Sequence, residues 1–182
     1  MIRISKAKVG TELEEGLQHL NSLARKEAEA ELLKCCGSAR WARAVSDSRP
    51  FESVHELLTK ADSVWWSLDA ADWLESFSHH PKIGERAAKQ RVAAEAQRWS
   101  EEEQSGAHGA AAETLAELVQ ANHDYERRFG YIYIVCATGK TSAEMLALLR
   151  ERIHNEPETE LRIAAEEQRK ITDLRLRKLL ES

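Results

Sequence analysis

Two adjacent histidines, His79 and His80, stand immediately before Pro81 in the chain. Proline fixes its own φ and restricts the residue before it, so the imidazole of His80 should project from a defined stretch of backbone. Histidine is the side chain best suited to exchange a proton near neutral pH, which makes His80 a candidate for proton transfer. The alternative is that both histidines merely end a helix, where a cationic side chain suits the helix dipole.

A second candidate is the carboxylate of Glu103, in the acidic stretch that follows Trp99. Ser100 and Glu103 have the spacing of a capping box, in which the glutamate simply binds the backbone N–H of the serine. A functional role is compatible with that arrangement, because a helix N-terminus presents free N–H groups and a positive dipole end to an anionic ligand. A carboxylate fixed there can accept hydrogen bonds from N–H or O–H groups of a ligand.

A third candidate is Arg175, near the end of the chain. At helical spacing it shares a face with apolar residues, namely Leu161, Ala164, Ala165, Ile171 and Leu179. An unpaired buried charge is very costly, so a guanidinium on such a face needs a partner. A substrate carboxylate could be that partner through bidentate hydrogen bonds. A structural ion pair with a protein carboxylate is the alternative.

The elements that must position these residues are helical. Eight glycines and three prolines are the only strong breakers among 182 residues, and Ala, Glu, Leu and Arg favour helices. Capping signals and apolar spacing predict helices that open at Thr11, span 26–36, lie around Trp41, span 53–68, run from Asp69 or Asp72 to His79, and span 100–128, 142–154 and 156–180.

Residues 129–136 break the helical pattern, because this run is β-branched and aromatic like a strand. No second such run exists to pair with it, so a sheet is not expected. We predict an irregular extended segment around Tyr131 to Cys136, whose buried backbone needs hydrogen-bond partners. A bound ligand rich in amides could be one of them. Since the chain shows no repeat or linker, we expect a single compact all-α domain over residues 1–182.

Composition excludes several classes of partner. The formal net charge is −5 and no dense basic patch stands out, so neither nucleic acid nor an anionic membrane is expected to bind. No apolar stretch is long enough to span a bilayer, and the first ten residues lack a signal-peptide core. The odd number of cysteines (Cys35, Cys36 and Cys136) argues against a disulfide framework and for reduced thiols. We therefore expect a cytoplasmic protein.

Two rival functions deserve comparison with an enzyme. A metal site could draw on Cys35, Cys36, His79, His80 or His108, but no pair has the spacing of a helical zinc motif or a CxxC knuckle, so no metal is expected. A non-enzymatic helical interaction module would fit the tryptophan and leucine stripes, which are usually just core. That interpretation leaves Arg175 and the extended run unexplained.

Taken together, these segments resemble the OHCU decarboxylase family (2-oxo-4-hydroxy-4-carboxy-5-ureidoimidazoline decarboxylase). The resemblance covers nearly the whole chain from about Lys34 onward and depends on the order and spacing of its motifs. In chain order the motifs are Cys36-Gly37-Ser38 with Trp41, Arg49-Pro50-Phe51, residues 80–84, Trp99-Ser100 with residues 103–106, Asn122 with Tyr125 and residues 128–131, Arg152 with Asn155, and Glu160-Leu161 followed by Leu174-Arg175-Leu176.

The resemblance implies a compact all-α fold, a homodimer, and no metal or organic cofactor. It implies decarboxylation of OHCU, a small-molecule ureide, to (S)-allantoin in urate degradation. The family's proton-transferring histidine falls on His80 rather than His79, its active-site glutamate on Glu103 and its arginine on Arg175. Its substrate contacts fall on Pro81, Ser100, Glu101, Glu102, Glu103, Gln104, Tyr133, Ile134, Val135, Cys136 and Ala137. The peroxisomal signal of many eukaryotic members is missing, which favours a cytoplasmic protein.

We therefore expect an imidazole, a carboxylate and a guanidinium to line one small pocket. In this hypothesis His80 transfers the proton, Glu103 grips N–H or O–H groups of the substrate, and Arg175 steadies the anionic substrate. Backbone groups of residues 134–137 would hydrogen-bond the ureido and ring amides.

Overall fold

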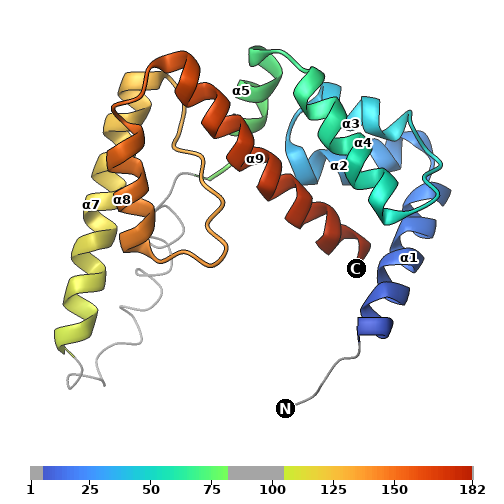
Figure 1. Cartoon of the computed structure of the whole chain (residues 1–182), viewed down its shortest axis with the longest axis horizontal. Coiled ribbons are helices and arrows are strands. Elements are labelled where there is room, and N and C mark those ends of the chain that lie inside the picture. The colour runs from blue at the N-terminus through green and yellow to red at the C-terminus, as the bar shows by residue number, and fades with distance from the viewer. Residues whose placement is uncertain (1–5, 82–104, 182) are drawn as a thin grey trace. The chain divides into compact units, whose positions relative to one another are not determined.

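The structure, a computed structural model, describes residues 6–81 and 105–181. Within these residues it contains eight helices and no strand, which confirms the all-α prediction (Figure 1). The helices are α1 (Lys6–Ser22), α2 (Arg25–Cys36), α3 (Ala39–Ser46), α4 (Val54–Ser67), α5 (Ala70–Ser78), α7 (Ser105–Phe129), α8 (Ser142–Arg152) and α9 (Pro157–Leu180).

The chain divides into two compact units. Unit 1 comprises Met1–Ser76 and Ala165–Ser182, and unit 2 comprises Phe77–Ala164. Helices α1 to α4, most of α5 and the C-terminal part of α9 belong to unit 1, whereas α7, α8 and the first turns of α9 belong to unit 2. That residues 1–182 act as one domain stays a prediction.

Local sequence signals set the helix ends in unit 1. Helix α2 stops at Gly37, as predicted, because this residue adopts a left-handed conformation with φ of 89° that glycine tolerates best. The hydroxyls of Ser38 and Ser53 then cap α3 and α4 by accepting hydrogen bonds from backbone N–H groups three residues on. Such caps satisfy donors that a helix start leaves unpaired.

Three tryptophans connect the helices of unit 1. The indole N–H of Trp41 in α3 donates to the carbonyl of Ala61 in α4, at 3.0 Å. Trp65 in α4 donates to the carbonyl of Ala165 in α9, also at 3.0 Å, and Trp73 in α5 donates to the carbonyl of Trp65, at 3.1 Å. Each ring is buried, so each pairs a large apolar contact with a satisfied donor. The C-terminal part of α9 therefore packs against α4 (Figure 1).

In unit 2, helices α7 and α8 lie side by side (Figure 1). One buried cluster of this unit joins the two helices to the chain between them and contains Leu118, Tyr125, Tyr133, Val135, Leu146 and Leu149. Gly130, with φ of 82°, lets the chain turn out of α7. Residues 132–137 then form neither helix nor strand, although they are buried except for Ala137. The predicted irregular segment is thereby confirmed.

Some predicted boundaries were wrong. The first helix begins at Lys6 instead of opening at Thr11, because one glycine inside a helix costs only about 1 kcal/mol and the residues before Gly10 continue the helix. Helix α8 ends at Arg152, two residues before the predicted end. Pro157 is the first residue of α9, where its missing N–H costs nothing, as predicted. The predicted start of the long helix at Ser100 lies outside the described residues.

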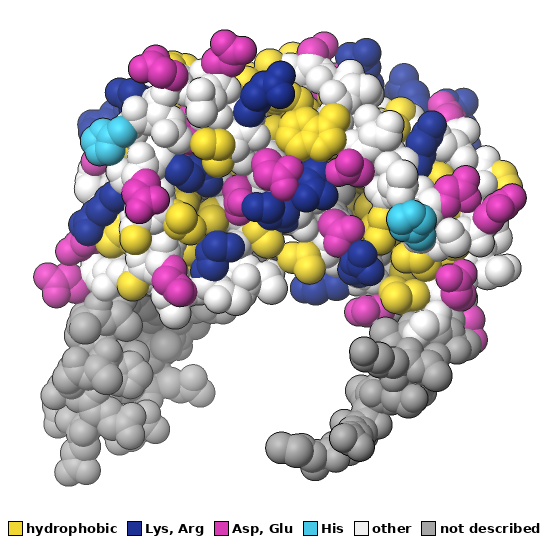
Figure 2. Space-filling model, viewed as in Figure 1, with side chains coloured by type: hydrophobic (Ala, Val, Ile, Leu, Met, Phe, Trp, Pro, Cys, Tyr) yellow, Lys and Arg dark blue, Asp and Glu magenta, His cyan; other side chains and the backbone are white. Residues whose placement is uncertain are grey.

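The surface carries charges of both signs. Figure 2 shows acidic and basic side chains interspersed on the face in view. Exposed ion pairs such as Arg25–Asp47 and Arg40–Asp69 belong to this surface, and pairs of this kind contribute about 0–1 kcal/mol each. Among residues 6–81 and 105–181, no helix has the length and apolar character needed to cross a membrane.

Candidate active site

His80 lies directly after α5, at the start of unit 2. Its backbone N–H donates to the carbonyl of Phe77 at 3.1 Å, and its side chain is partly buried, whereas His79 and Pro81 are exposed. The ring of Phe77 packs against the ring of Tyr131, with centroids 5.4 Å apart. The turn that carries His80 is therefore hydrogen-bonded to Phe77, whose ring contacts Tyr131 at the start of the irregular segment.

Side chains of neighbouring elements hold the backbone of the irregular segment. The Tyr133 N–H donates to Asn122 Oδ1 (3.0 Å), the Ile134 C=O accepts from Arg152 Nη1 (2.9 Å), and the Cys136 C=O accepts from Lys140 Nζ (2.8 Å). Between these anchors, neither the N–H nor the C=O of Val135 has a hydrogen-bond partner within the described part of the chain. Val135 is nevertheless only 8% exposed. A buried peptide group of this kind is open to a ligand that carries both donors and acceptors.

Arg152, which binds the Ile134 carbonyl of this segment, belongs to a buried network of charged groups. Glu160 is fully buried and accepts hydrogen bonds from Arg152 Nε (2.8 Å), Arg152 Nη2 (2.6 Å), Asn155 Nδ2 (2.7 Å) and the hydroxyl of Tyr125. Four donors thus satisfy one carboxylate in a place that water does not reach. A buried charge is tolerable only when it is paired and hydrogen-bonded in this way.

The network also fixes the charge states of its members. Burial, and then the adjacent Glu160 carboxylate, raises the pKa of Tyr125 well above its usual range. Burial alone would lower the pKa of Arg152, but the hydrogen bonds to Glu160 and the negative charge of that carboxylate together raise this pKa above its usual value. At neutral pH, Tyr125 is therefore a neutral donor and Arg152 a cation.

Sequence analysis missed the roles of Arg152 and Glu160. Both residues belong to motifs quoted for the resemblance, but their eight-residue separation spans the break between α8 and α9. The i, i+3 and i, i+4 rules apply within one helix, so no spacing signal points to this pair. The only available signal was a charged residue in otherwise apolar surroundings, as for Arg175.

Arg175 lies in unit 1, on α9, and is half-buried. The buried stripe of α9 in this unit is Ala165, Gln168, Thr172, Leu176 and Leu180. Arg175 lies beside this stripe, seven residues after Gln168. Its Nη1 donates to the carbonyl of Cys35 at 3.3 Å, and it forms no ion pair with any carboxylate of residues 6–81 or 105–181. The guanidinium keeps donors for another group.

The three cysteines are free and buried, as predicted. Burial raises the pKa of Cys35 to about 12, although the nearby Arg175 acts in the opposite direction. Burial likewise raises the pKa of Cys36. Both thiols are therefore protonated at neutral pH and are poor nucleophiles. Among the described residues no group of three or more His, Cys, Asp and Glu side chains could hold a metal ion.

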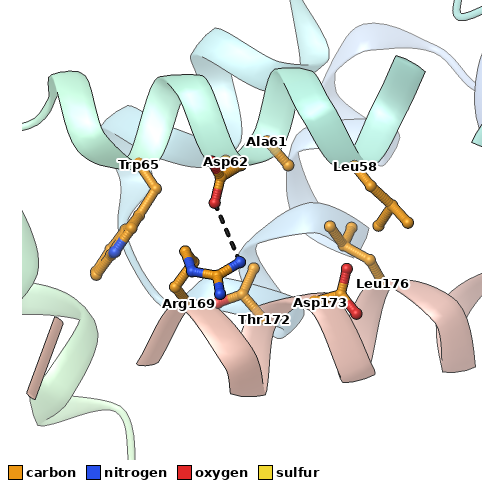
Figure 3. Close-up of a pocket in the computed structure, with 8 residues that line it drawn as sticks. All are labelled: Leu58, Ala61, Asp62, Trp65, Arg169, Thr172, Asp173 and Leu176. Atoms are coloured by element: carbon orange, nitrogen blue, oxygen red, sulfur yellow. Dashed lines mark hydrogen bonds and ion pairs between the residues drawn. The ribbon is translucent and has the colours of Figure 1, made fainter. Parts of the chain in front are cut away.

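A small cavity lies between α4 and α9 in unit 1 (Figure 3). It is lined by Leu58, Ala61, Asp62, Trp65, Arg169, Thr172, Asp173 and Leu176. Its volume is about 20 Å³, which suffices for about one water molecule and not for a ureide. None of the predicted site residues lines it, so it does not serve as the candidate active site.

The structure places part of the predicted site within unit 2. His80 and residues 133–137 belong to this unit and are connected through the ring contact of Phe77 with Tyr131. Ser100, Glu101, Glu102, Glu103 and Gln104 lie outside the described residues. Since Arg175 belongs to unit 1, the convergence of His80, Glu103 and Arg175 on one pocket stays a prediction.

Sequence comparison gives a family and close relatives. The family model for OHCU decarboxylase matches residues 21–177. The uric acid degradation bifunctional protein TTL of Arabidopsis thaliana is 41% identical over 158 residues, which make up 86% of this chain and 48% of the relative. The chain thus spans about half the length of that protein. The 2-oxo-4-hydroxy-4-carboxy-5-ureidoimidazoline decarboxylase of Amia calva is 34% identical over 140 residues, or 77% of this chain and 79% of the relative.

Solved structures share the fold. A crystal structure of OHCU decarboxylase in the presence of (S)-allantoin has 40% sequence identity and a TM-score of 0.67, and the match covers 84% of this chain and 98% of that one. A crystal structure of (S)-allantoin synthase has a TM-score of 0.66 over 90% of this chain and 53% of its own. Its 20% identity supports the fold alone.

Proposed function

Because the chain belongs to the OHCU decarboxylase family, we propose that it catalyses the decarboxylation of OHCU to (S)-allantoin in urate degradation. The observation that carries this proposal is the match to a whole OHCU decarboxylase, 98% of that chain at 40% identity, whose structure was determined in the presence of (S)-allantoin. The family membership favours an enzyme, a carboxy-lyase, over a non-enzymatic helical interaction module.

The reaction sets three tasks for the protein. The bond between a ring carbon and the carboxylate breaks, CO₂ leaves, and the electron pair stays on the ring, where the adjacent unsaturated bond spreads it as an enol-type intermediate. A proton must then reach one face of the ring to give one enantiomer. Since the substrate is its own electron sink, we propose that orientation, stabilisation of charge and proton delivery suffice without a metal or organic cofactor.

His80 is our proposed proton-transfer residue. Its position is supported by the turn at the end of α5, where a backbone hydrogen bond to Phe77 and the following Pro81 restrict the chain. The partly buried imidazole lies in the same unit as the irregular segment, which is the proposed substrate-binding backbone. A proton donor there could act on one face of a ring held by that backbone.

The irregular segment is our proposed site for the ureide. A ureido group carries N–H donors beside a C=O acceptor, and the N–H and C=O of Val135 complement that pattern. The neighbouring carbonyls of Ile134 and Cys136 already accept hydrogen bonds from Arg152 and Lys140, so they are less available. The remaining contacts that we propose are Pro81, Tyr133, Ala137 and the acidic stretch Ser100, Glu101, Glu102, Glu103 and Gln104.

We propose that Glu103 binds N–H or O–H groups of the substrate and that Arg175 binds its negative charge. For Arg175, support comes from its side chain, which has no carboxylate partner among residues 6–81 and 105–181 and donates only to the Cys35 carbonyl. A guanidinium fork matches a carboxylate in geometry and charge.

Replacing His80 with Ala tests the function most directly. OHCU would be generated in the cuvette from urate, and the allantoin formed would be followed by circular dichroism, because unaided decay gives a racemate. We expect turnover to fall about 100-fold or more, since general acid–base catalysis contributes about 10²–10⁴. The neighbouring exposed His79→Ala variant should keep the native rate. A His80→Ala variant that still makes (S)-allantoin at that rate would contradict the role of His80.

Replacing Arg175 with Lys tests the second role. Lysine keeps the charge but lacks the fork, so we expect kcat/KM to fall about tenfold to a hundredfold, the range for a hydrogen bond to a charged group. Arg177→Lys, on the exposed side of the same helix, is the matched control. A decrease of less than about twofold for Arg175→Lys would favour a purely structural arginine.

We also propose that the protein is a cytoplasmic homodimer and that residues 1–182 act together as one domain. Analytical ultracentrifugation of the purified chain measures whether it is a dimer. A single calorimetric transition for both units would support one domain. A sedimentation coefficient that corresponds to a monomer at micromolar concentration would refute the dimer.

A further inference from the structure

The guanidinium of Arg152 connects a buried carboxylate to the irregular segment. Its Nε and Nη2 donate to Glu160 Oε1, while Nη1 donates to the carbonyl of Ile134 at 2.9 Å. Its Cζ atom also lies 4.7 Å from the centre of the Tyr133 ring. One side chain therefore contacts two consecutive residues of the segment, one through the backbone and one through the ring.

Glu160 holds Arg152 in this position. Its carboxylate is fully buried and is itself fixed by Asn155 Nδ2 at 2.7 Å and by the hydroxyl of Tyr125. A planar guanidinium that makes two hydrogen bonds to a fixed carboxylate has little freedom to rotate. The direction of Nη1, and with it the place of the Ile134 carbonyl, is set by Tyr125 on α7, Glu160 on α9 and Asn155 between α8 and α9.

We propose that Arg152 and Glu160 are positioning residues, which hold the irregular segment so that the backbone of Val135 can bind the ureide. Arg152 and Lys140 occupy the carbonyls of Ile134 and Cys136, whereas the N–H and C=O of Val135 between them have no hydrogen-bond partner within the described part of the chain. This inference rests on the proposed function, because it assigns the segment to substrate binding.

Energetics favour a positioning role over a role in stability alone. Taking two charges out of water costs about as much as their mutual attraction returns, so a buried ion pair adds little net stability compared with apolar residues of similar size. Its hydrogen bonds, however, are directional. The pair therefore offers geometry that a packed leucine could not supply.

The test uses Glu160→Gln, which keeps the shape of the side chain and removes its charge. We would measure KM and kcat for OHCU separately, and amide hydrogen exchange of residues 131–137 by mass spectrometry. We expect KM to rise at least tenfold with a much smaller change in kcat, and exchange of these residues to accelerate at least tenfold. The exposed pair between α7 and α8 supplies the control, since Glu117→Gln should change neither quantity.

A folded Glu160→Gln variant with native KM and native exchange would overturn the proposal. Exchange that accelerates evenly throughout α7 and α8 without a change in KM would also overturn it, because that pattern indicates general loosening. If Glu160→Gln does not fold, Tyr125→Phe removes only the hydroxyl hydrogen bond and keeps the ring. That variant should show smaller changes in the same direction, and native values would overturn the proposal.

The same experiments separate this proposal from the proposed function. A wild-type chain that yields only racemic allantoin at the rate of unaided decay would overturn the function. The hydrogen-exchange comparison needs no substrate, so it would still decide whether the buried pair holds the segment.

Discussion

Two arginine–carboxylate groups in this chain have similar chemistry and different surroundings. In unit 2 the side chains of Arg152 and Glu160 are 10% and 0% exposed. In unit 1 Arg169 binds Asp62 at 3.2 Å and Glu166 at 2.8 Å, with exposures of 34% for the arginine and 45% and 38% for the carboxylates. Water can replace a lost partner in the second group but not in the first.

This difference in exposure gives the two arginine–carboxylate groups different roles. Arg169 reaches from α9 to Asp62 on α4 across the small cavity (Figure 3), where solvent screens the attraction. Arg152 uses its third nitrogen to hold a backbone carbonyl that solvent does not screen. Burial, rather than residue type, decides which pair sets the geometry of a neighbouring segment.

The largest expected effect is that of Arg152→Met. This change leaves Glu160 buried with two charged hydrogen bonds missing and also frees the Ile134 carbonyl. Breaking a buried pair from one side costs about 3–5 kcal/mol, so the free energy of unfolding, measured by urea denaturation, should fall by that amount.

The double variant Arg152→Met/Glu160→Met sharpens this comparison. Removing both charges avoids the uncompensated carboxylate, and apolar replacements of buried pairs are often neutral or stabilising. We expect the double variant to recover most of the stability lost in the single one. A double variant less stable than Arg152→Met would mean that the charge of Glu160 is not what makes the single change costly.

A much smaller effect is expected for Arg169→Met in unit 1. Its partners Asp62 and Glu166 become hydrated when the arginine is lost, so the free energy of unfolding should change by less than about 1 kcal/mol. The same urea titration measures it. A loss as large as that of Arg152→Met would contradict the distinction between the two groups.

The smallest expected effect is the pH dependence contributed by Glu166. The hydrogen bond from Arg169, opposed by partial burial, lowers the pKa of this carboxyl below its usual value of 4.5. The folded state therefore favours the ionised form, and the resulting stability is present above the unfolded pKa and lost as pH falls through the lowered pKa.

Wild type should consequently lose more stability than Glu166→Gln on acidification from about pH 6 to about pH 3, by about a few tenths of a kcal/mol. Thermal unfolding at several pH values measures the difference. If both proteins lose stability in parallel over this range, the Arg169 hydrogen bond does not stabilise the ionised carboxyl.

Much of the fold could be predicted from the sequence because its signals are local. Gly37 ends a helix through its own backbone, Ser53 caps the next one within three residues, and Pro157 begins α9. The irregular segment was predictable because a single strand-like run has nothing to pair with. The start of α1 was not, since the capping-box spacing at Thr11 has no meaning once the helix has already begun.

The candidate site, too, was predictable only where its signals are local in the sequence. Its residue types, such as a histidine before a proline and an arginine with apolar neighbours at helical spacing, are visible in the sequence. Where a charge is buried is not, because that depends on how α8 and α9 turn toward each other between residues 152 and 157. The sequence alone thus determined the helices and the chemical groups, whereas tertiary packing decided that Arg152 meets Glu160 out of reach of water and that Arg175 flanks the buried stripe of α9.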